Sequence, residues 1–258
     1  MLIINADDFG RSRLATDRIL SCYKQGSVTS TSAMVFMEDS QRAADLAREY
    51  SIDVGLHINF TQKLTQRISG SLLCDYHDRI VGFLTRNKYN FLIYNPALRK
   101  HFEYVFQVQL EEFERLYGMS PSHIDGHHHM HLCANMLFET IIPAGQKVRR
   151  NFSFARGEKS LLNRMYRAVI DKWLARRYQM TDYYFSLSER IKSGRLAYAL
   201  ELANASIVEL ETHPELGKEF EWLMGNACTQ AISNLQRGTY SQLKVSVYPG
   251  NKSSSRNE

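Results

Sequence analysis

The sequence predicts an α/β protein, a distorted (β/α) barrel of about seven strands. Short apolar runs alternate with amphipathic stretches along the chain, which is the pattern of a parallel sheet covered by helices. No internal repeat and no proline- or serine-rich linker divides the 258 residues, a length at which such barrels form one domain. The polar side chains suited to chemistry follow the ends of predicted strands, as they do at the carboxyl face of a barrel.

The first predicted strand is the apolar run Leu2–Asn5, which stops at two acids, Asp7 and Asp8. Apolar and β-branched residues mark the remaining strands. These are Thr29–Phe36, Ile52–Ile58, His123–Asp125, Val148–Phe154, Asp182–Phe185, Ile207–Thr212 and Leu243–Tyr248.

Helices are predicted between these strands by three- and four-residue spacing of apolar side chains. The first begins at a Ser12 cap, runs to about Gln25 and ends at Gly26. The others are Ser40–Tyr50, Leu98–Tyr117, Asn135–Gln146, Ser160–Tyr178, Ser188–Ala203, Glu219–Met224 and Ala227–Arg237.

Residues 1–250 are expected to form a single domain, followed by a polar, disordered tail at 251–258. Between them, residues 60–95 are interrupted by glycine and asparagine and predict an insertion with one or two short helices. Long insertions in compact domains are more often functional than accidental, so a lid over the site is one interpretation. A plain surface excursion is the other.

The predicted helix Ser160–Tyr178 is basic and amphipathic. Its apolar side comprises Leu161, Leu162, Met165, Val169, Trp173 and Leu174, and its basic residues are Arg164, Arg167, Lys172, Arg176 and Arg177. A packed helix with a solvated basic face is the favoured interpretation. Peripheral contact with a membrane surface or with an anionic substrate is the alternative.

Composition restricts the class of protein. The net charge of +5 mildly favours anionic partners, but aromatic residues are not interleaved with basic ones, so nucleic acid is not expected as a partner. No apolar run is long enough to span a membrane, and the first residues lack the features of a signal peptide. Four cysteines without a Cys-x-x-Cys pair predict reduced thiols in a cytoplasmic protein, with homo-oligomerisation left open.

The stretch His123–His131 reads His-Ile-Asp-Gly-His-His-His-Met-His and holds five of the nine histidines in the chain. Neutral imidazole is the commonest protein metal ligand, so a formed metal site is favoured over a solvated histidine-rich loop. Neighbouring side chains diverge, so the remaining ligands must come from elsewhere. Asn5–Gly10 and Gly55–Asn59 supply candidates.

We predict that Asp8, His57 and His127 bind the metal. One carboxylate and two imidazoles with open positions suit a divalent catalytic ion, with zinc or magnesium first and cobalt, nickel or manganese as alternatives. His131, four residues after His127, is expected on the same helical face as a fourth ligand or as a partner of a ligand. The structural alternatives are a helix cap for Asp8 and a satisfied core histidine for His57.

Asp7 then remains free to act as a general base, taking a proton from water as the water attacks a carbonyl. His213, directly after the predicted strand Ile207–Thr212, is placed to protonate the leaving amine. Arg149 is expected to keep Asp7 ionised by charge pairing, and Asp125 to orient a ligand histidine. Arg150 or a structural salt bridge would explain the last two features equally well.

Five segments of the chain resemble the YdjC-like carbohydrate deacetylase family, which includes chitooligosaccharide deacetylases and hopanoid-associated deacetylases. They are Asn5–Gly10 (NADDFG), Gly26–Thr31 (GSVTST), Gly55–Asn59 (GLHIN), Ser122–His131 (SHIDGHHHMH) and Val208–Pro214 (VELETHP). The resemblance implies a barrel related to polysaccharide deacetylases, with a divalent metal at positions matching Asp8, His57 and His127. It also implies a base at Asp7 and an acid at His213.

The expected function is therefore metal-dependent removal of an N-acetyl group from a sugar that is free, lipid-linked or nucleotide-linked. A metal-dependent phosphoesterase acting on a sugar phosphate is the alternative within enzymes, and it would suit the basic net charge. An iron oxygenase could share the ligand set but normally uses an all-β fold. A non-catalytic sugar-binding relative would need neither Asp7 nor His213.

Overall fold

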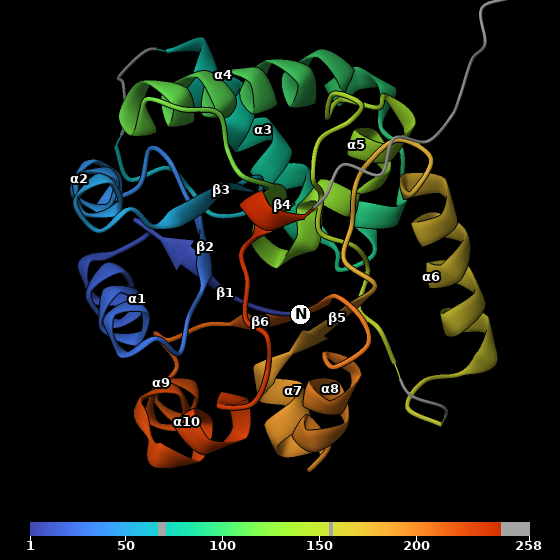
Figure 1. Ribbon diagram of the computed structural model, residues 1–258. Helices are drawn as coiled ribbons and strands as arrows, with labels where there is room; N and C mark the ends of the chain where they lie inside the picture. The colour runs from blue at the N-terminus through green and yellow to red at the C-terminus, as the bar shows by residue number, and fades with distance from the viewer. Residues whose placement is uncertain (67–70, 155–156, 244–258) are drawn as a thin grey trace, which may run out of the picture.

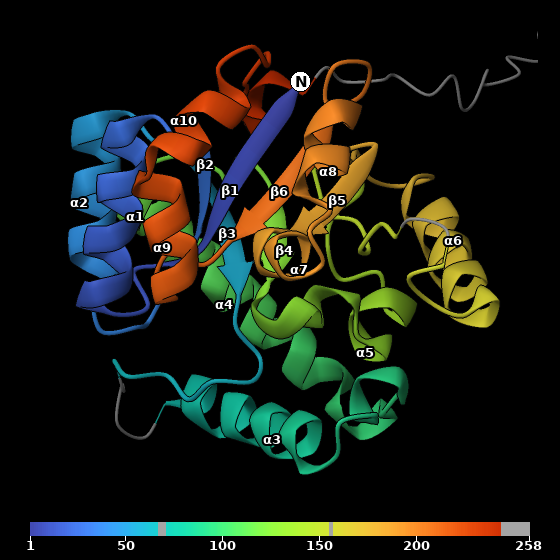
Figure 2. The same ribbon diagram turned by 90° about the horizontal axis from the view of Figure 1, so that it is seen from below.

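The computed structural model describes residues 1–66, 71–154 and 157–243, and it confirms the predicted fold class (Figure 1). A six-stranded parallel sheet in the order β4-β3-β2-β1-β6-β5 curls into a half-barrel. Its strands are β1 (Leu2–Phe9), β2 (Ser30–Ala33), β3 (Asp53–Ile58), β4 (Ile124–Gly126), β5 (Tyr183–Ser186) and β6 (Val208–Thr212). The first strand of the chain thus lies in the middle of the sheet (Figure 2).

Helices surround the sheet in both views (Figures 1 and 2). They are α1 (Arg13–Gln25), α2 (Ser40–Tyr50), α3 (Leu72–Arg86), α4 (Arg99–Tyr117), α5 (Ala134–Phe138), α6 (Leu161–Leu174), α7 (Leu187–Lys192), α8 (Leu196–Leu202), α9 (Gly217–Met224) and α10 (Asn226–Ile232). Short 3-10 turns lie at Asn90–Leu92, Pro96–Leu98, His127–Leu132 and Tyr240–Gln242. The predicted ends of α1 are confirmed, because Ser12 accepts a hydrogen bond from Ala15 and Gly26 is left-handed at φ 77°.

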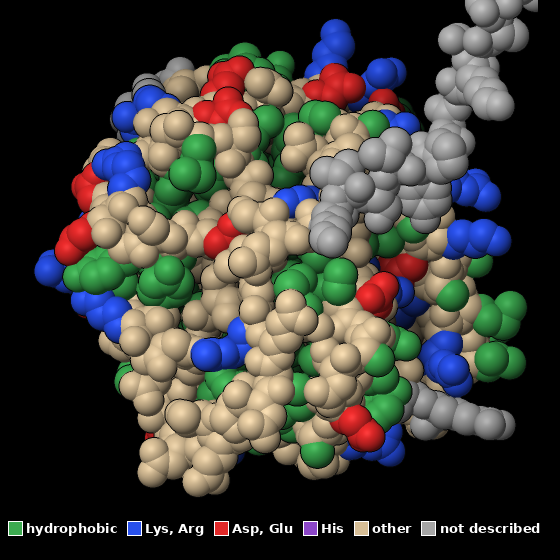
Figure 3. All heavy atoms as spheres, in the orientation of Figure 1, with side chains coloured by type: hydrophobic (Ala, Val, Ile, Leu, Met, Phe, Trp, Pro, Cys, Tyr) green, Lys and Arg blue, Asp and Glu red, His purple; other side chains and the backbone are tan. Residues whose placement is uncertain are grey.

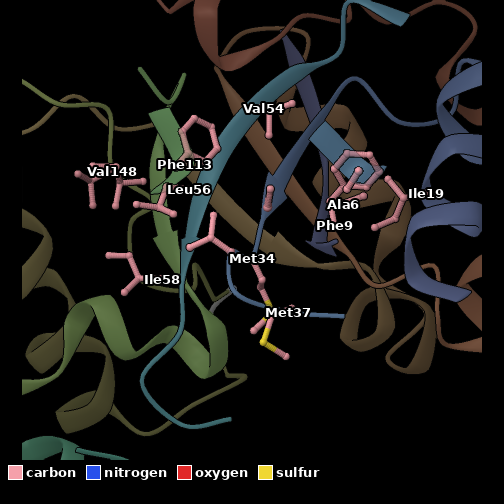
Figure 4. Close-up of a cluster of buried hydrophobic side chains, with 14 of the residues drawn as sticks. Ala6, Phe9, Ile19, Met34, Met37, Val54, Leu56, Ile58, Phe113 and Val148 are labelled. Atoms are coloured by element: carbon pink, nitrogen blue, oxygen red, sulfur yellow. The ribbon is translucent and has the colours of Figure 1, made fainter. Parts of the chain in front are cut away.

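The two faces of β1 differ in chemistry because successive side chains of a strand point to opposite sides of a sheet. Leu2, Ile4 and Ala6 belong to the main hydrophobic core. Part of that core is drawn in Figure 4, where Phe9 and Ile19 lie beside Ala6. The alternate residues Asn5 and Asp7 are buried on the other side of β1. The inside of the half-barrel is therefore lined there by polar side chains.

The predicted strand Val148–Phe154 is not a regular strand. Residues 147 and 148 form single parallel bridges, and the segment fills the space between the edge strands β4 and β5. Arg149 donates its N–H to the Ile124 carbonyl at 3.1 Å, and Ser153 donates to the Tyr184 carbonyl at 2.8 Å. Pairing is interrupted at Asn151, whose N–H is instead donated to the Asp171 carboxylate at 3.0 Å.

Other differences have local causes. The insertion at 60–95 contains one fifteen-residue helix, α3, where shorter pieces were expected. The helix predicted for Asn135–Gln146 ends at Phe138, just before Thr140 adopts φ 49°. Ser188–Ala203 is divided into α7 and α8 at the left-handed Gly194. In the strand predicted at Leu243–Tyr248, residues 244–248 lie outside the described residues, as does the tail at 251–258.

Gly55 on β3 is required by a close contact with β4. A Cβ added at Gly55 would lie 2.3 Å from the ring of His123, which is buried and stacked on Tyr240 with 3.7 Å between ring centroids. We expect Gly55→Ala to lower the free energy of unfolding by about 1–3 kcal/mol through this overlap. Urea denaturation followed by circular dichroism measures the change.

Gly82→Ala is the matched control, because Gly82 lies exposed inside α3 and its added Cβ would contact nothing within 4 Å. There the same substitution should stabilise the protein by about 0.5–1 kcal/mol, since alanine restricts the unfolded chain and favours a helix. Equal stability of Gly55→Ala and the wild type would contradict the close packing of β3 against His123.

Candidate metal centre

The carboxyl ends of β1 and β3 and the turn after β4 bring three predicted ligands together. Oδ1 of Asp8 lies 3.4 Å from Nε2 of His57 and 2.9 Å from Nδ1 of His127. All three residues are buried, and their ligand atoms lie within 4.8 Å of one another. Residues separated by about fifty to seventy positions in sequence thus face one point, as the carboxyl face of a barrel requires.

A backbone irregularity allows both Asp7 and Asp8 to enter the site. The pairing of β1 with β2 shifts register between Ala6 and Phe9, and Asp8 adopts the left-handed φ of 71°. A regular strand would point consecutive side chains to opposite faces. The bulge turns Asp8 toward the histidines while Asp7 continues into the barrel interior.

The donor set fits a cation. Oδ1 of Asp8 and Nε2 of His57 are buried without a hydrogen-bond partner among the described residues, an unfavourable state that a metal ion would relieve. Nδ1 of His57 lies 2.8 Å from Oδ1 of Asp125, so a hydrogen bond there leaves the Nε2 lone pair facing Asp8. Asp125 is thus in the orienting position that the sequence predicts for it.

Arg149 is fully buried in the barrel interior and binds three carboxylates. Its Nη1 and Nη2 contact the two oxygens of Asp7 at 2.6 and 2.7 Å. Its Nη2 also lies 2.7 Å from Oδ2 of Asp125, and its Nε lies 2.7 Å from Oε1 of Glu209. The predicted pairing with Asp7 is present, and it is part of a larger ionic cluster.

The cluster changes the acidity of its members. Burial would raise the pKa of Asp7, but the guanidinium of Arg149 and nearby His57 hold it well below its usual range. Burial also acts on Glu209, and there it prevails over Arg149 and raises the pKa to about 7. Asp7 is therefore ionised throughout the neutral range, while Glu209 titrates within it.

His213 lies on the open side of Asp7. Its Nε2 is 3.9 Å from Oδ2 of Asp7, and about a third of its side chain (32%) is accessible to solvent. Its backbone N–H is donated to Glu219 at 2.6 Å, which fixes the residue directly after β6. Asp7 thus contacts a buried guanidinium on one side and a partly exposed imidazole on the other.

His131 does not share a helical face with His127, so that prediction is wrong. The segment His127–Leu132 is a 3-10 turn with a kink, because His128 and His129 have left-handed φ values of 53° and 60°. The turn places Nε2 of His131 3.0 Å from the Arg149 carbonyl. His131 supports the backbone that carries Arg149, and the Asp8–His57–His127 group does not include it.

Sequence reasoning missed two acids on β6, Glu209 and Glu211. Both are buried, and Oε1 of Glu211 lies 3.6 Å from Nη1 of Arg149. The signal was available in Val208–Thr212, where two glutamates alternate with apolar residues and must share one face of a strand. Asn5 and Ser32 were also missed; they donate to Oδ1 of Asp7 at 2.9 and 3.2 Å.

The fold and site define a parallel α/β half-barrel with a carboxylate–imidazole group at the carboxyl ends of its strands. A search of protein families matches residues 1–241 to the YdjC-like proteins, and the chain belongs to that family. A solved structure from Enterococcus faecalis V583, assigned provisionally to cellobiose-phosphate cleavage, has the same fold. Its TM-score is 0.65 at 20% identity over 94% of this chain and 98% of that chain.

Sequence relatives include a chitooligosaccharide deacetylase of Proteus mirabilis, 34% identical over 150 residues, which are 55% of this chain and 53% of that protein. A carbohydrate deacetylase of Clostridium beijerinckii is 37% identical over 135 residues, 50% of each chain. A carbohydrate deacetylase of Danio rerio is 30% identical over 51% of this chain and 42% of its own. The chain spans about half the length of the curated relatives it matches.

Replacing Arg149 with methionine tests the ionic cluster. The variant leaves Asp7, Asp125 and Glu209 buried without their cation, and we expect it to lose about 3–5 kcal/mol of unfolding free energy at pH 7. The folded pKa of Asp7 is lowered in the wild type, so its pairing stabilises above the unfolded pKa of about 3.9 and is lost in acid. The deficit of the variant should therefore shrink from pH 7 to pH 5, as its unpaired carboxylates take up protons.

Urea titrations at the two pH values measure this difference. Arg164→Met is the control, because Arg164 is exposed on α6 and its loss should change stability by less than about 0.5 kcal/mol. A deficit for Arg149→Met that is small or independent of pH would show that the cluster does not depend on Arg149.

Proposed function

We propose that the chain is a metal-dependent hydrolase that removes the acetyl group from an N-acetylated sugar. The observation that carries the proposal is the position of Asp7, which is locked to Arg149, faces His213 and adjoins the Asp8–His57–His127 group. A base and an acid on either side of a metal position suit amide hydrolysis. The names of the relatives from Proteus mirabilis and Clostridium beijerinckii support the same reaction.

Asp8, His57 and His127 would hold the divalent metal through one oxygen and two nitrogens. When bound, such a metal polarises the substrate carbonyl and lowers the pKa of a water molecule that becomes the nucleophile. Two imidazole ligands favour zinc, cobalt, nickel or manganese over magnesium, which prefers oxygen ligands and near-octahedral geometry. Zinc is therefore our first choice and magnesium falls behind the other ions.

Asp7 would take the proton of the attacking water. Its Oδ1 accepts from Arg149, Asn5 and Ser32, whereas Oδ2, on the side of His213, accepts only from Nη1 of Arg149 among the described residues and keeps a lone pair for the proton. Arg149 keeps the carboxylate ionised at neutral pH, as a general base must be.

His213 would donate a proton to the amine nitrogen as the carbon–nitrogen bond breaks and acetate departs. It is partly exposed, and its Nε2 lies 3.9 Å from Oδ2 of Asp7. Asp7 and His213 would thus serve the two halves of the reaction, the carboxylate as the base and the imidazole as the acid.

A cavity of about 420 Å³ beside the centre is the proposed substrate pocket. His128 and His129, the two residues after His127, line it, and Phe91 and Leu92 of the 60–95 insertion form part of its wall. We therefore infer that the insertion shapes the pocket, whether or not it closes as a lid. Acetate release measured over free, lipid-linked and nucleotide-linked N-acetylated sugars would identify the substrate.

The compartment and the assembly are also proposals. Cys22, Cys133 and Cys228 are buried free thiols, which supports a reducing, cytoplasmic compartment. A homo-oligomer remains a prediction. A phosphoesterase is the weaker alternative, because Asp7, Asp8 and Glu211 around the centre would repel a phosphate dianion.

Asp7→Asn should separate metal binding from catalysis. We expect the variant to keep its bound zinc but to release acetate from N-acetylglucosamine oligomers or conjugates about 10²–10⁴ times more slowly, because the general base is lost. Asp8→Asn is the control and should lose metal and activity together. Metal content by atomic emission and acetate by a coupled assay are measured on the same samples.

The same assay decides between the candidate functions. Phosphate release from a sugar phosphate, without acetate release from any acetylated sugar, would replace the deacetylase with a phosphoesterase. Sugar binding without either product would identify a non-catalytic relative.

His213→Ala should have little effect on the hydrolysis rate of substrates whose leaving group needs no proton. We expect the variant to lose about 10²-fold or more in kcat for an N-acetyl amide, whose amine departs only when protonated. Hydrolysis of 4-nitrophenyl acetate, which releases a stable phenolate, should fall by much less. An equal loss on both substrates would contradict the assignment of His213 as the acid.

A further inference from the structure

The outer face of α6 is apolar and exposed to solvent. Leu161, Leu162, Met165 and Val169 are 69%, 79%, 56% and 67% accessible, and Leu174 is the one buried residue of the helix. The packed helix with a solvated basic face, favoured from the sequence, is confirmed for Trp173 and Leu174, which pack against the core, and is wrong for these four exposed residues. A helix on the surface of a globular protein normally turns its apolar stripe toward the core.

The inner face of α6 combines apolar packing by Ile170, Trp173 and Leu174 with polar contacts. Asp171 lies 2.7 Å from Arg150 and accepts the N–H of Asn151 at 3.0 Å. Arg167 is partly buried, bonds to Asn163 at 2.9 Å and stacks over the Phe154 ring. The helix thus has a packed inner side and, in addition, an exposed apolar stripe of Leu161, Leu162, Met165 and Val169. An apolar face of this kind marks an interaction surface.

Basic residues accompany the stripe. Met165, Val169, Lys172 and Arg176 follow one another at four, three and four positions, so the apolar row continues into two exposed cations, and Arg164 lies beside it. The ion pairs described nearby use Arg150, Arg190 and Arg195. Figure 3 shows green and blue side chains together along the right-hand margin, where α6 stands at the edge of the molecule in Figure 1.

We propose that this face of α6 docks the protein on an anionic membrane surface. Exposed leucine, methionine and valine would enter the boundary between headgroups and acyl chains while Arg164, Lys172 and Arg176 contact anionic headgroups. The fourteen residues of α6 extend about 21 Å, less than the roughly 30 Å of a hydrocarbon core, so the helix would lie along the surface. In the described part of the chain, no helix is long and apolar enough to cross a membrane.

A second copy of the chain fits this face less well. A two-fold contact through α6 would bring Arg164, Lys172 and Arg176 of one copy against the same residues of the other. Like charges placed together at an interface oppose association. The basic border is complementary to phosphate-bearing lipid, and the net charge of +5 acts in the same direction.

Docking would also place the proposed substrate pocket close to the membrane. The other side of α6 contributes Asn163, Tyr166 and Ile170 to the 420 Å³ cavity that His128 and His129 line. One helix would therefore carry the membrane contact on one side and the pocket wall on the other. The proposal concerns a surface outside the catalytic centre and stands even if the deacetylase function fails.

The test is cosedimentation with vesicles of phosphatidylcholine containing 30% phosphatidylglycerol and with vesicles of phosphatidylcholine alone. The wild type should bind the anionic vesicles preferentially, and salt should weaken the binding. Leu162→Glu with Val169→Glu should reduce the partition coefficient more than tenfold. Lys172→Gln with Arg176→Gln should reduce it about 25-fold, at about fivefold for each cation near a charged surface.

The matched control replaces two exposed apolar residues elsewhere, Leu14→Glu with Met119→Glu, and should bind as the wild type does. Circular dichroism and acetate release from a soluble sugar report whether each variant is folded. Absence of wild-type binding to anionic vesicles, or equal binding by the wild type and the Leu162→Glu/Val169→Glu variant, would overturn the proposal. It would also be overturned by a wild-type dimer that this variant converts to monomer, since the face would then be an interface between copies.

Discussion

The arrangement of the site depends on one buried cation. Arg149 enters the half-barrel from the irregular segment between β4 and β5 and contacts carboxylates from β1, β4 and β6. Removing these charges from water is expensive, and only their mutual contacts offset the expense. The strands must therefore approach within hydrogen-bond distance of a single guanidinium, which fixes their spacing more tightly than an apolar interior would. The inside of this barrel is organised by charge, while the apolar core lies outside the sheet.

The chemistry of the candidate centre follows from that constraint. Asp7 is fixed by Arg149, and the bulge after it turns Asp8 to the other side of the same strand end. Two adjacent carboxylates are thus given different surroundings, one dominated by a guanidinium and the other by two imidazoles. Asp125 connects the proposed metal ligands with the ionic cluster of Arg149, because one of its oxygens binds His57 and the other binds Arg149. A proposed ligand and a proposed base are held by the same interior cluster.

Sequence reasoning predicted the fold class and brought Asp7, Asp8, His57, His127 and His213 to one place, because alternating apolar runs fix which residues stand at strand ends. Sequence reasoning failed where the contacts of individual side chains differ from what the spacing of apolar and polar residues predicts. The glutamates of β6 were missed because buried charge appears unfavourable until its partner is known. His131 was misplaced because four-residue spacing assumes a helix, and α6 because an apolar stripe was assumed to face inward. The glutamates depend on Arg149, which lies far away in the chain, whereas His131 was displaced by a local kink at His128 and His129.

The central position of β1 bears on how the protein is made. β1 pairs with β2, which follows it closely in the sequence, but its other neighbour, β6, lies about two hundred residues later, with Leu2 opposite Val208. Until β6 leaves the ribosome, one edge of the innermost strand has no hydrogen-bonding neighbour. An open strand edge invites pairing with other nascent chains. The sheet is thus closed around β1 only after β2 to β5 have been made.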